Sequence, residues 1–315
     1  MEHLIFSLNA TIPIFLVMFI GYLCKQCKLM KGDFIQSLNA LNYKLTLPAL
    51  LFRDISQADF YSVWDTKYVL FCFLVTLFCI CILWLGATFL CKDKTILGEL
   101  VQASYRGSAA VLGIAFIQNI YGSSGMAPLM IIGTVPLYNI AAVVILSFTA
   151  PGMKGPDKAA IRKTCLDILK NPIILSILLG ILCSLCRLNF PTILDKTLGN
   201  IASLATPLAL IALGAAFEGK QAMSKLKPTL ICLFIKLILQ PAIFLFPAAV
   251  MGFRDEKMVA ILVMLGAPTT ASCYIMARNT GHEGVLTSSA VVTTTFFSSV
   301  TLTFWLYLLK MKGLI

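Results

Sequence analysis

Three basic residues, Arg106, Lys44 and Lys236, lie inside apolar stretches long enough to span a membrane. A charge in the hydrocarbon core is energetically costly, so such residues often mark ion or substrate pathways. All 14 acidic residues, by contrast, fall in predicted loops, tails or end turns of spans, and Glu99 in a first turn is nearest the core. The excess charge at mid-depth is therefore positive, which favours an anionic ligand.

Arg106 stands directly before Gly107 and Ser108, two small residues in the middle of its apolar stretch. A guanidinium group there can donate a pair of N–H bonds to a carboxylate. It can equally cap backbone carbonyls freed by a break in the helix, and the sequence leaves both roles open. For Lys44 and Lys236, the sequence favours snorkelling to the interface or facing a water-filled cavity over substrate contact.

The sequence lacks the residues that proton relays and common enzyme motifs require. Proton relays in membranes use buried Asp, Glu or His, and the two His residues, His3 and His282, are near the ends of spans. A dedicated proton-coupling residue is therefore not indicated, whereas sodium held by backbone carbonyls is compatible with the sequence. No zinc-protease, phosphate-loop or intramembrane-protease motif occurs, so we expect no enzyme activity, no catalytic residue and no cofactor.

Two Cys-x-x-Cys motifs, at 24–27 and 183–186, have the spacing of zinc ligands. The topology derived below places them on opposite faces of the membrane, where one metal ion cannot reach both. We interpret them as corresponding parts of an internal repeat and expect no metal site.

Composition identifies the environment of these residues. The chain is 59% hydrophobic and 12% charged, with a mean hydropathy of +0.90, whereas a soluble domain needs more surface charge. Its apolar runs reach about 20 residues, which spans a bilayer. The net charge of +11 resides mostly in short loops without a basic helix, so the expected partner is the lipid bilayer and not nucleic acid.

The apolar runs predict an all-α membrane protein with ten transmembrane helices in a single integral membrane domain, 1–315. The run at 4–24 lacks the flanks of a cleavable signal and is interpreted as the first span. A linker at about 149–170 separates a first repeat, about 1–150, from a second, about 171–315. The ten predicted spans are roughly 4–24, 34–56, 68–91, 96–120, 126–148, 171–188, 197–218, 228–252, 258–279 and 284–309.

The distribution of Lys and Arg between loops predicts the orientation. Loops after odd-numbered spans hold 14 of these residues and loops after even-numbered spans hold 6. Basic loops stay on the cytoplasmic side. We therefore expect a multi-pass protein of the plasma membrane with a cytoplasmic linker and both termini extracytoplasmic.

An internal repeat appears when the chain is shifted by 159 residues. Residues 13–29 then align with residues 172–188 with eight identities in 17 positions. The same shift pairs Pro48 with Pro207 and Gly107 with Gly266. Because each copy has an odd number of predicted spans, the second enters the membrane from the opposite side. Such inverted repeats are typical of secondary transporters, although anion channels are a second class compatible with these residues.

Two spans carry signals for a break at mid-depth. Residues 107–109 and 266–268 lie about 15 Å into the fourth and ninth spans at helical rise. Pro268 removes a backbone donor and Gly266 permits a bend. Half-helices starting near Ala110 and Thr269 would direct unpaired N–H groups towards the centre, which suits an anion. The alternative is that the glycines only allow close helix packing.

Several segments together give a resemblance to a known family. They are SYRGSAAVLGIAF at 104–116, VPLYNIAAV at 135–143, the Asn171–Pro172 pair, and GAPTTASCYIMARN at 266–279 with the following VVTTTFFSSVTL at 291–302. Over nearly its whole length the chain resembles the auxin efflux carrier family of permeases, bacterial type, within the bile-acid/arsenite/riboflavin transporter grouping.

The resemblance implies two inverted five-helix repeats with broken, crossing helices four and nine. It also implies elevator-like alternating access and transport of small organic anions, which are auxin in plants and malate or malonate in bacterial members. Ser108 departs from the Asn that contacts substrate in the family, Ala115 from a Pro, and Leu51 from a Ser of plant carriers. Tyr138 and Asn139 match the family pair beside the substrate.

We therefore expect a secondary transporter of a dicarboxylate or auxin-like carboxylate, with an anion channel and a sodium-coupled organic anion symporter as alternatives. A homodimer is a further expectation. The predicted substrate-binding residues are Leu51, Arg106, Gly107, Ser108, Tyr138, Asn139, Gly266, Pro268, Thr269 and Thr270.

Overall fold

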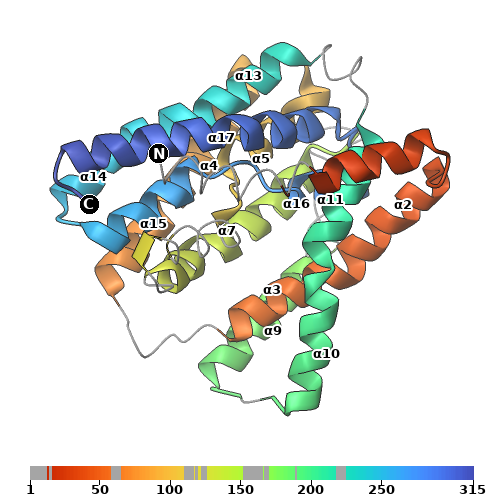
Figure 1. Cartoon of the computed structure of the whole chain (residues 1–315), viewed down its shortest axis with the longest axis horizontal. Coiled ribbons are helices and arrows are strands. Elements are labelled where there is room, and N and C mark those ends of the chain that lie inside the picture. The colour runs from red at the N-terminus through yellow and green to blue at the C-terminus, as the bar shows by residue number, and fades with distance from the viewer. Residues whose placement is uncertain are drawn as a thin grey trace.

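The computed structural model describes residues 13, 16–57, 65–109, 117, 120–121, 126–151, 166, 170–188, 190–217 and 225–315 (Figure 1). Every regular element within these residues is a helix. Most of the linker at about 149–170, and the half-helix predicted to start near Ala110, lie outside the described residues.

The helices form two groups, which we call the small group and the large group. In the small group, α3 packs along α9 and α10, and α11 packs on α2; in Figure 1, α3, α9 and α10 extend away from the rest. The small group consists of the helix Leu16–Gln26, α2 (Gly32–Leu41), η1 (Asn42–Thr46), α3 (Leu47–Ser56), α9 (Pro172–Leu185), α10 (Thr192–Ser203) and α11 (Ala205–Ala216).

The large group is built around α7, which packs on α4, α5 and α15. Contacts of α16 with α2 and α11, and of α7 with α9, join it to the small group. The large group consists of α4 (Thr66–Leu90), η2 (Lys94–Ile96), α5 (Leu97–Tyr105), α7 (Ala127–Phe148), α13 (Leu226–Phe234), η3 (Ile235–Leu239), α14 (Gln240–Val250), α15 (Asp255–Gly266), α16 (Ser272–Asn279) and α17 (Val285–Met311).

Among the described residues, five helices are long and apolar enough to cross a membrane, and they agree with five of the predicted spans within a few residues. Their outward faces carry large apolar side chains such as Phe78 and Leu85 of α4, which need an apolar environment. The five are Thr66–Leu90, Leu129–Phe148, Thr192–Ala216, Leu226–Val250 and Val285–Met311.

The other predicted spans contain shorter or irregular helices. The first is described as a helix over Leu16–Gln26, and the sixth is α9, where the Asn171 side chain caps the helix ahead of Pro172. The second span is interrupted by the π-turn η1. One of the five long helices, Leu226–Val250, is interrupted in the same way by the π-turn η3. Both turns precede a proline, Pro48 or Pro241, whose missing N–H and bulky ring disfavour continuous α-helical bonding.

The two segments aligned by the internal repeat end in the same way. Lys28 and Arg187, 159 positions apart, both have positive φ, of 60° and 50°. The N–H of the next residue bonds back to a cysteine carbonyl in each case, Leu29 to Cys24 at 2.9 Å and Leu188 to Cys183 at 3.0 Å. These bonds form the same C-terminal cap twice, here without the glycine that such caps usually contain.

The repeat also extends to packing between helices. A Cβ on Gly180 of α9 would lie 3.1 Å from the Phe52 carbonyl oxygen of α3, and one on Gly21 would overlap the Ile211 carbonyl of α11. Gly21 and Ile211 are the 159-residue counterparts of Gly180 and Phe52. The helix Leu16–Gln26 therefore packs on α11 much as α9 packs on α3, and small residues permit both approaches.

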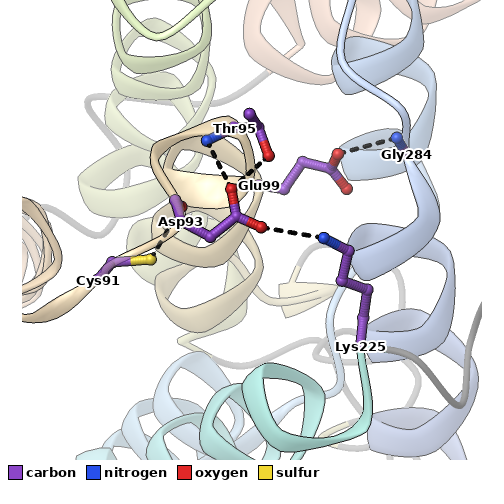
Figure 2. Close-up of polar contacts among 6 residues, drawn as sticks. All are labelled: Cys91, Asp93, Thr95, Glu99, Lys225 and Gly284. Carbon is purple, nitrogen blue, oxygen red and sulfur yellow. Dashed lines mark hydrogen bonds and ion pairs between the residues drawn. The ribbon is translucent and has the colours of Figure 1, made fainter.

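Polar contacts join loops that are far apart in sequence. Asp93 accepts bonds from Thr95 N and Oγ1 and forms an ion pair with Lys225 at 3.1 Å (Figure 2). At the ends of other helices, Lys257 pairs with Asp65 and Arg53 pairs with Asp195. Each pair joins loops that the topology predicted from the sequence would place on the same side of the membrane.

Glu99 has a structural role in the first turn of α5. Its carboxylate is buried and accepts the backbone N–H of Gly284 at 2.9 Å (Figure 2). It also accepts the backbone N–H of Thr287 at 2.9 Å. These donors open α17, where Gly284 has φ of +73°. A carboxylate at a helix N-terminus is stabilising, so this acidic residue serves to dock α17 on α5.

The close approach at Gly214 predicts a stability defect. A Cβ there would overlap the Met18 carbonyl, whereas a Cβ on Gly86 of α4 meets nothing within 4 Å. We expect Gly214→Ala to destabilise the protein by about 1–3 kcal/mol through overpacking, and Gly86→Ala to be neutral or slightly stabilising. Thermal melting in detergent compares the two variants, and equal melting temperatures would contradict the packing described.

The Asp93–Lys225 pair predicts a pH-dependent contribution. Hydrogen bonds from Thr95 and Lys225 lower the pKa of Asp93. A lowered folded-state pKa gives stability that is present above the ordinary Asp pKa of about 3.9 and is lost as the pH falls through the folded value. We expect Asp93→Asn to melt earlier than wild type at pH 7, with the gap closing towards pH 3. A gap independent of pH would exclude the ion pair as its cause.

Candidate functional site

The site forms where two helices end beside each other. α5 ends at Tyr105 and α15 at Gly266, and both are followed by extended backbone at Arg106 and Ala267. Pro268 favours this course because proline disfavours an α-helical residue before it. The two extended segments pair: Ser108 N donates to Pro268 O at 2.8 Å, and Gly107 forms a bridge with Thr269.

Lys236 and Gln240 bind the carbonyls that these helix ends leave free. Lys236 Nζ is 3.2 Å from Tyr105 O and 3.2 Å from Met264 O, and its side chain is fully buried. Gln240 Nε2 donates to Ser104 O at 2.9 Å. The prediction that Lys236 snorkels or faces water is therefore wrong, because the helix ends supply polar partners inside the protein. Lys44 is exposed.

Arg106 is buried without a carboxylate partner among the described residues. Its side chain is 3% exposed and contacts Asn139 Oδ1 through Nη2 and Met276 Sδ through Nη1. Among the described residues it caps no helix carbonyl; of the two roles that the sequence left open, the capping seen there belongs to Lys236 and Gln240. Within the part of the chain that the structure describes, the guanidinium contacts a neutral amide and a thioether.

A cavity of about 140 Å³ lies between the two groups of helices, with Arg106 in its wall. Nine of the ten predicted site residues line it, while Gly266 instead packs towards Pro241 of α14, 3.3 Å from a built Cβ. The lining comprises Asn42, Leu47, Leu50, Leu51, Asp54, Arg106, Gly107, Ser108, Val135, Tyr138, Asn139, Ala205, Thr206, Ala209, Leu210, Pro268, Thr269, Thr270, Ala271, Ser272, Ile275, Val291 and Thr295.

Most polar groups in the wall are already engaged within the protein. Tyr138 OH donates to Met264 O at 3.3 Å, and Asn139 Nδ2 donates to Val135 O at 2.8 Å. Thr269 N donates to Thr294 Oγ1 and Thr269 Oγ1 to Ala103 O. The N–H of Thr269 is thus not free for an anion, and α16 begins at Ser272, three residues later than expected, because Thr269 is held by the bridge.

Other lining residues were missed by the sequence analysis. Asp54, in the last turn of α3, reaches the cavity together with Leu47 and Leu51. Their spacing of three to four residues, which places them on one helix face, was the available signal. Asn42 was missed too, and its Nδ2 ties η1 to Ala205 O at the start of α11.

The cap formed by Gln240 predicts a stability loss. Gln240→Met keeps the side-chain length but leaves the buried Ser104 carbonyl without this donor. An unsatisfied buried acceptor costs about 1–3 kcal/mol, so we expect a lower melting temperature. Gln26→Met, at an exposed position, is the matched control and should melt like wild type. Equal melting of both variants would show that the cap is dispensable.

Comparison with known proteins agrees with this membrane architecture. The chain is 25% identical over 318 residues to the uncharacterized transporter YfdV of Escherichia coli (strain K12), covering 98% of this chain and 99% of the relative. It is 26% identical to a Rhizobium meliloti (strain 1021) protein named "Putative malonate transporter", covering 96% of each. An uncharacterized transporter of Methanocaldococcus jannaschii is 22% identical, with 96% and 98% covered.

The model of one family, described as "Membrane transport protein", matches residues 6–306. The resemblance to auxin efflux carriers is confirmed, since this is the family to which that group of permeases belongs. The chain therefore belongs to the membrane transport protein family and is a membrane transporter.

Proposed function

We propose that this transporter is a secondary carrier of a small organic anion, with a short dicarboxylate as the preferred substrate. The observation that carries the proposal is Arg106, a buried guanidinium in the wall of the cavity without a carboxylate partner among the described residues. Burying an unpaired charge is costly unless a ligand compensates it. A substrate carboxylate in the cavity would supply that compensation.

The surroundings of Arg106 suit a carboxylate. The guanidinium can donate paired N–H bonds to two carboxylate oxygens. The Ser108 hydroxyl lies in the same wall, and the described residues give it no hydrogen bond, so it is a second donor for the anion. At about 140 Å³ the cavity has room for several water molecules. That space suits an acid of a few carbons better than an aromatic auxin-like acid, in line with the name of the Rhizobium relative.

The location of the cavity favours alternating access of the elevator type. One wall comes from α3, η1 and α11 of the small group, and the other from α7, α17 and the segment between α15 and α16 of the large group. A substrate bound mainly by the large group could therefore be carried along the small group. The small group would be the scaffold in this scheme.

The ten-helix inverted repeat is part of the same proposal. It is supported by the matched helix caps at Lys28 and Arg187, by the matched glycine contacts at Gly21 and Gly180, and by the ion pairs that join loops of one side. The helix ends at Tyr105 and Gly266 support the breaks in helices four and nine. Placement in the plasma membrane with both termini extracytoplasmic stays a prediction from loop charge.

Flux measurements separate a carrier from an anion channel. Proteoliposomes are loaded with unlabelled malonate and supplied with labelled malonate, malate, succinate or indole-3-acetate outside. We expect saturable uptake and counterflow, with the short dicarboxylates favoured. Current that is linear in voltage without exchange would indicate a channel, and flux of neutral or cationic compounds alone would exclude the proposal.

Substitutions of Arg106 test its role as substrate ligand. Arg106→Lys keeps the charge but loses the fork geometry, and we expect affinity to fall about ten- to a hundredfold, as for a lost charged hydrogen bond. Arg106→Ala should bind no acid. Arg254→Ala is the control, because that side chain bonds Ala249 O and Phe253 O away from the cavity. A folded Arg106→Ala protein with unchanged apparent affinity would refute the assignment.

A further inference from the structure

The surroundings of the Lys236 ammonium consist of neutral oxygens. Nζ lies 3.2 Å from Tyr105 O, 3.2 Å from Met264 O and 3.5 Å from Gln240 Oε1. No carboxylate of the described residues forms an ion pair with it, and the side chain is fully buried. An ion pair therefore does not explain why a lysine occupies this position.

The two backbone oxygens belong to helix ends that carry negative partial charge. Tyr105 is the last residue of α5, and Met264 lies in the last turn of α15. The final carbonyls of a helix lack partners within it and form the negative end of its dipole. Carbonyls at such half-helix ends, near a substrate site, are the groups with which secondary transporters hold a coupling sodium ion.

Two features of the neighbouring backbone leave room for this ammonium. A Cβ on Gly107 would lie 2.9 Å from Lys236 Nζ and 3.0 Å from Cε, so a larger residue at 107 would crowd the lysine. Lys236 also lies in the π-turn η3, whose extra residue changes the direction of the following side chains. The Gly107 contact and the π-turn are independent of the hydrogen bonds and point to the same role.

We propose that Lys236 is a tethered cation that occupies a small-cation site formed by Tyr105 O, Met264 O and Gln240 Oε1. The inference extends the proposed carrier function, and its consequence for transport rests on that function. The ammonium stabilises the two helix ends as part of the chain itself, so the wild-type protein needs no sodium to form the anion site. Gly107 lies in the cavity wall and touches Lys236, which places the fixed charge directly behind the substrate. Lys236 is thus a positioning residue.

Shortening the side chain should turn the occupied position into an empty cation site. The Lys236→Ala protein is purified in choline chloride, then melted in detergent in 150 mM choline, sodium, lithium or potassium chloride. Lys44→Ala is the matched control, because Lys44 lies in the other π-turn and is exposed. We expect sodium or lithium to raise the melting temperature of Lys236→Ala by on the order of 3–5 °C. Wild type and Lys44→Ala should melt equally in all four salts.

The result does not depend on knowing the substrate. Labelled malonate uptake by wild-type proteoliposomes is measured in parallel and should not respond to a sodium gradient. If malonate and the other acids are not transported, the proposed function fails while the melting experiment still decides the cation site. Sodium stabilisation or sodium-driven uptake of wild type would overturn the inference. So would a Lys236→Ala protein that is indifferent to every cation, or one that is unfolded in all of them.

Discussion

The pairing of two interrupted helices inside an apolar protein is the constraint on which the site depends. Backbone groups that leave a helix within a membrane must find partners in the protein, because the lipid offers none. Here the freed N–H of Ser108 bonds to Pro268 O, and the freed carbonyls of Ser104, Tyr105 and Met264 bond to side chains of one neighbouring helix. The non-helical segments persist because these freed groups have partners inside the protein.

The two buried cations, Lys236 and Arg106, therefore have different roles. Lys236 faces the carbonyl ends of α5 and α15 and satisfies them. Arg106, one residue beyond the end of α5, is thereby released from capping and faces Asn139, Met276 and the cavity. If the guanidinium capped the carbonyls at the helix ends, its N–H donors would not be available to a ligand. The guanidinium donors are therefore available to a ligand because Lys236 of η3 and Gln240 of α14 bind the freed carbonyls. Neither element lines the cavity.

The sequence could predict the features that depend on local residue types. Gly107, Pro268 and the uncompensated Arg106 are visible because glycine, proline and charge are unusual in an apolar helix. The partners of Lys236 were not predictable, since they depend on a π-turn before Pro241 and on the convergence of α5 and α15, which lie more than 100 residues apart. Asp54 lies near the end of a predicted span and was overlooked, although its spacing from Leu51 places both residues on one face of α3, and the packing of α3 brings that face to the cavity.

The charges also bear on movement under the proposed function. With an empty cavity, the large group would carry the charge of Arg106 past an apolar wall that includes Leu47, Leu51 and Leu210 of the small group. Moving an unpaired charge through such surroundings is costly, and a bound anion removes most of that cost. The loaded transporter should therefore cross more readily than the empty one, which favours exchange of one anion for another.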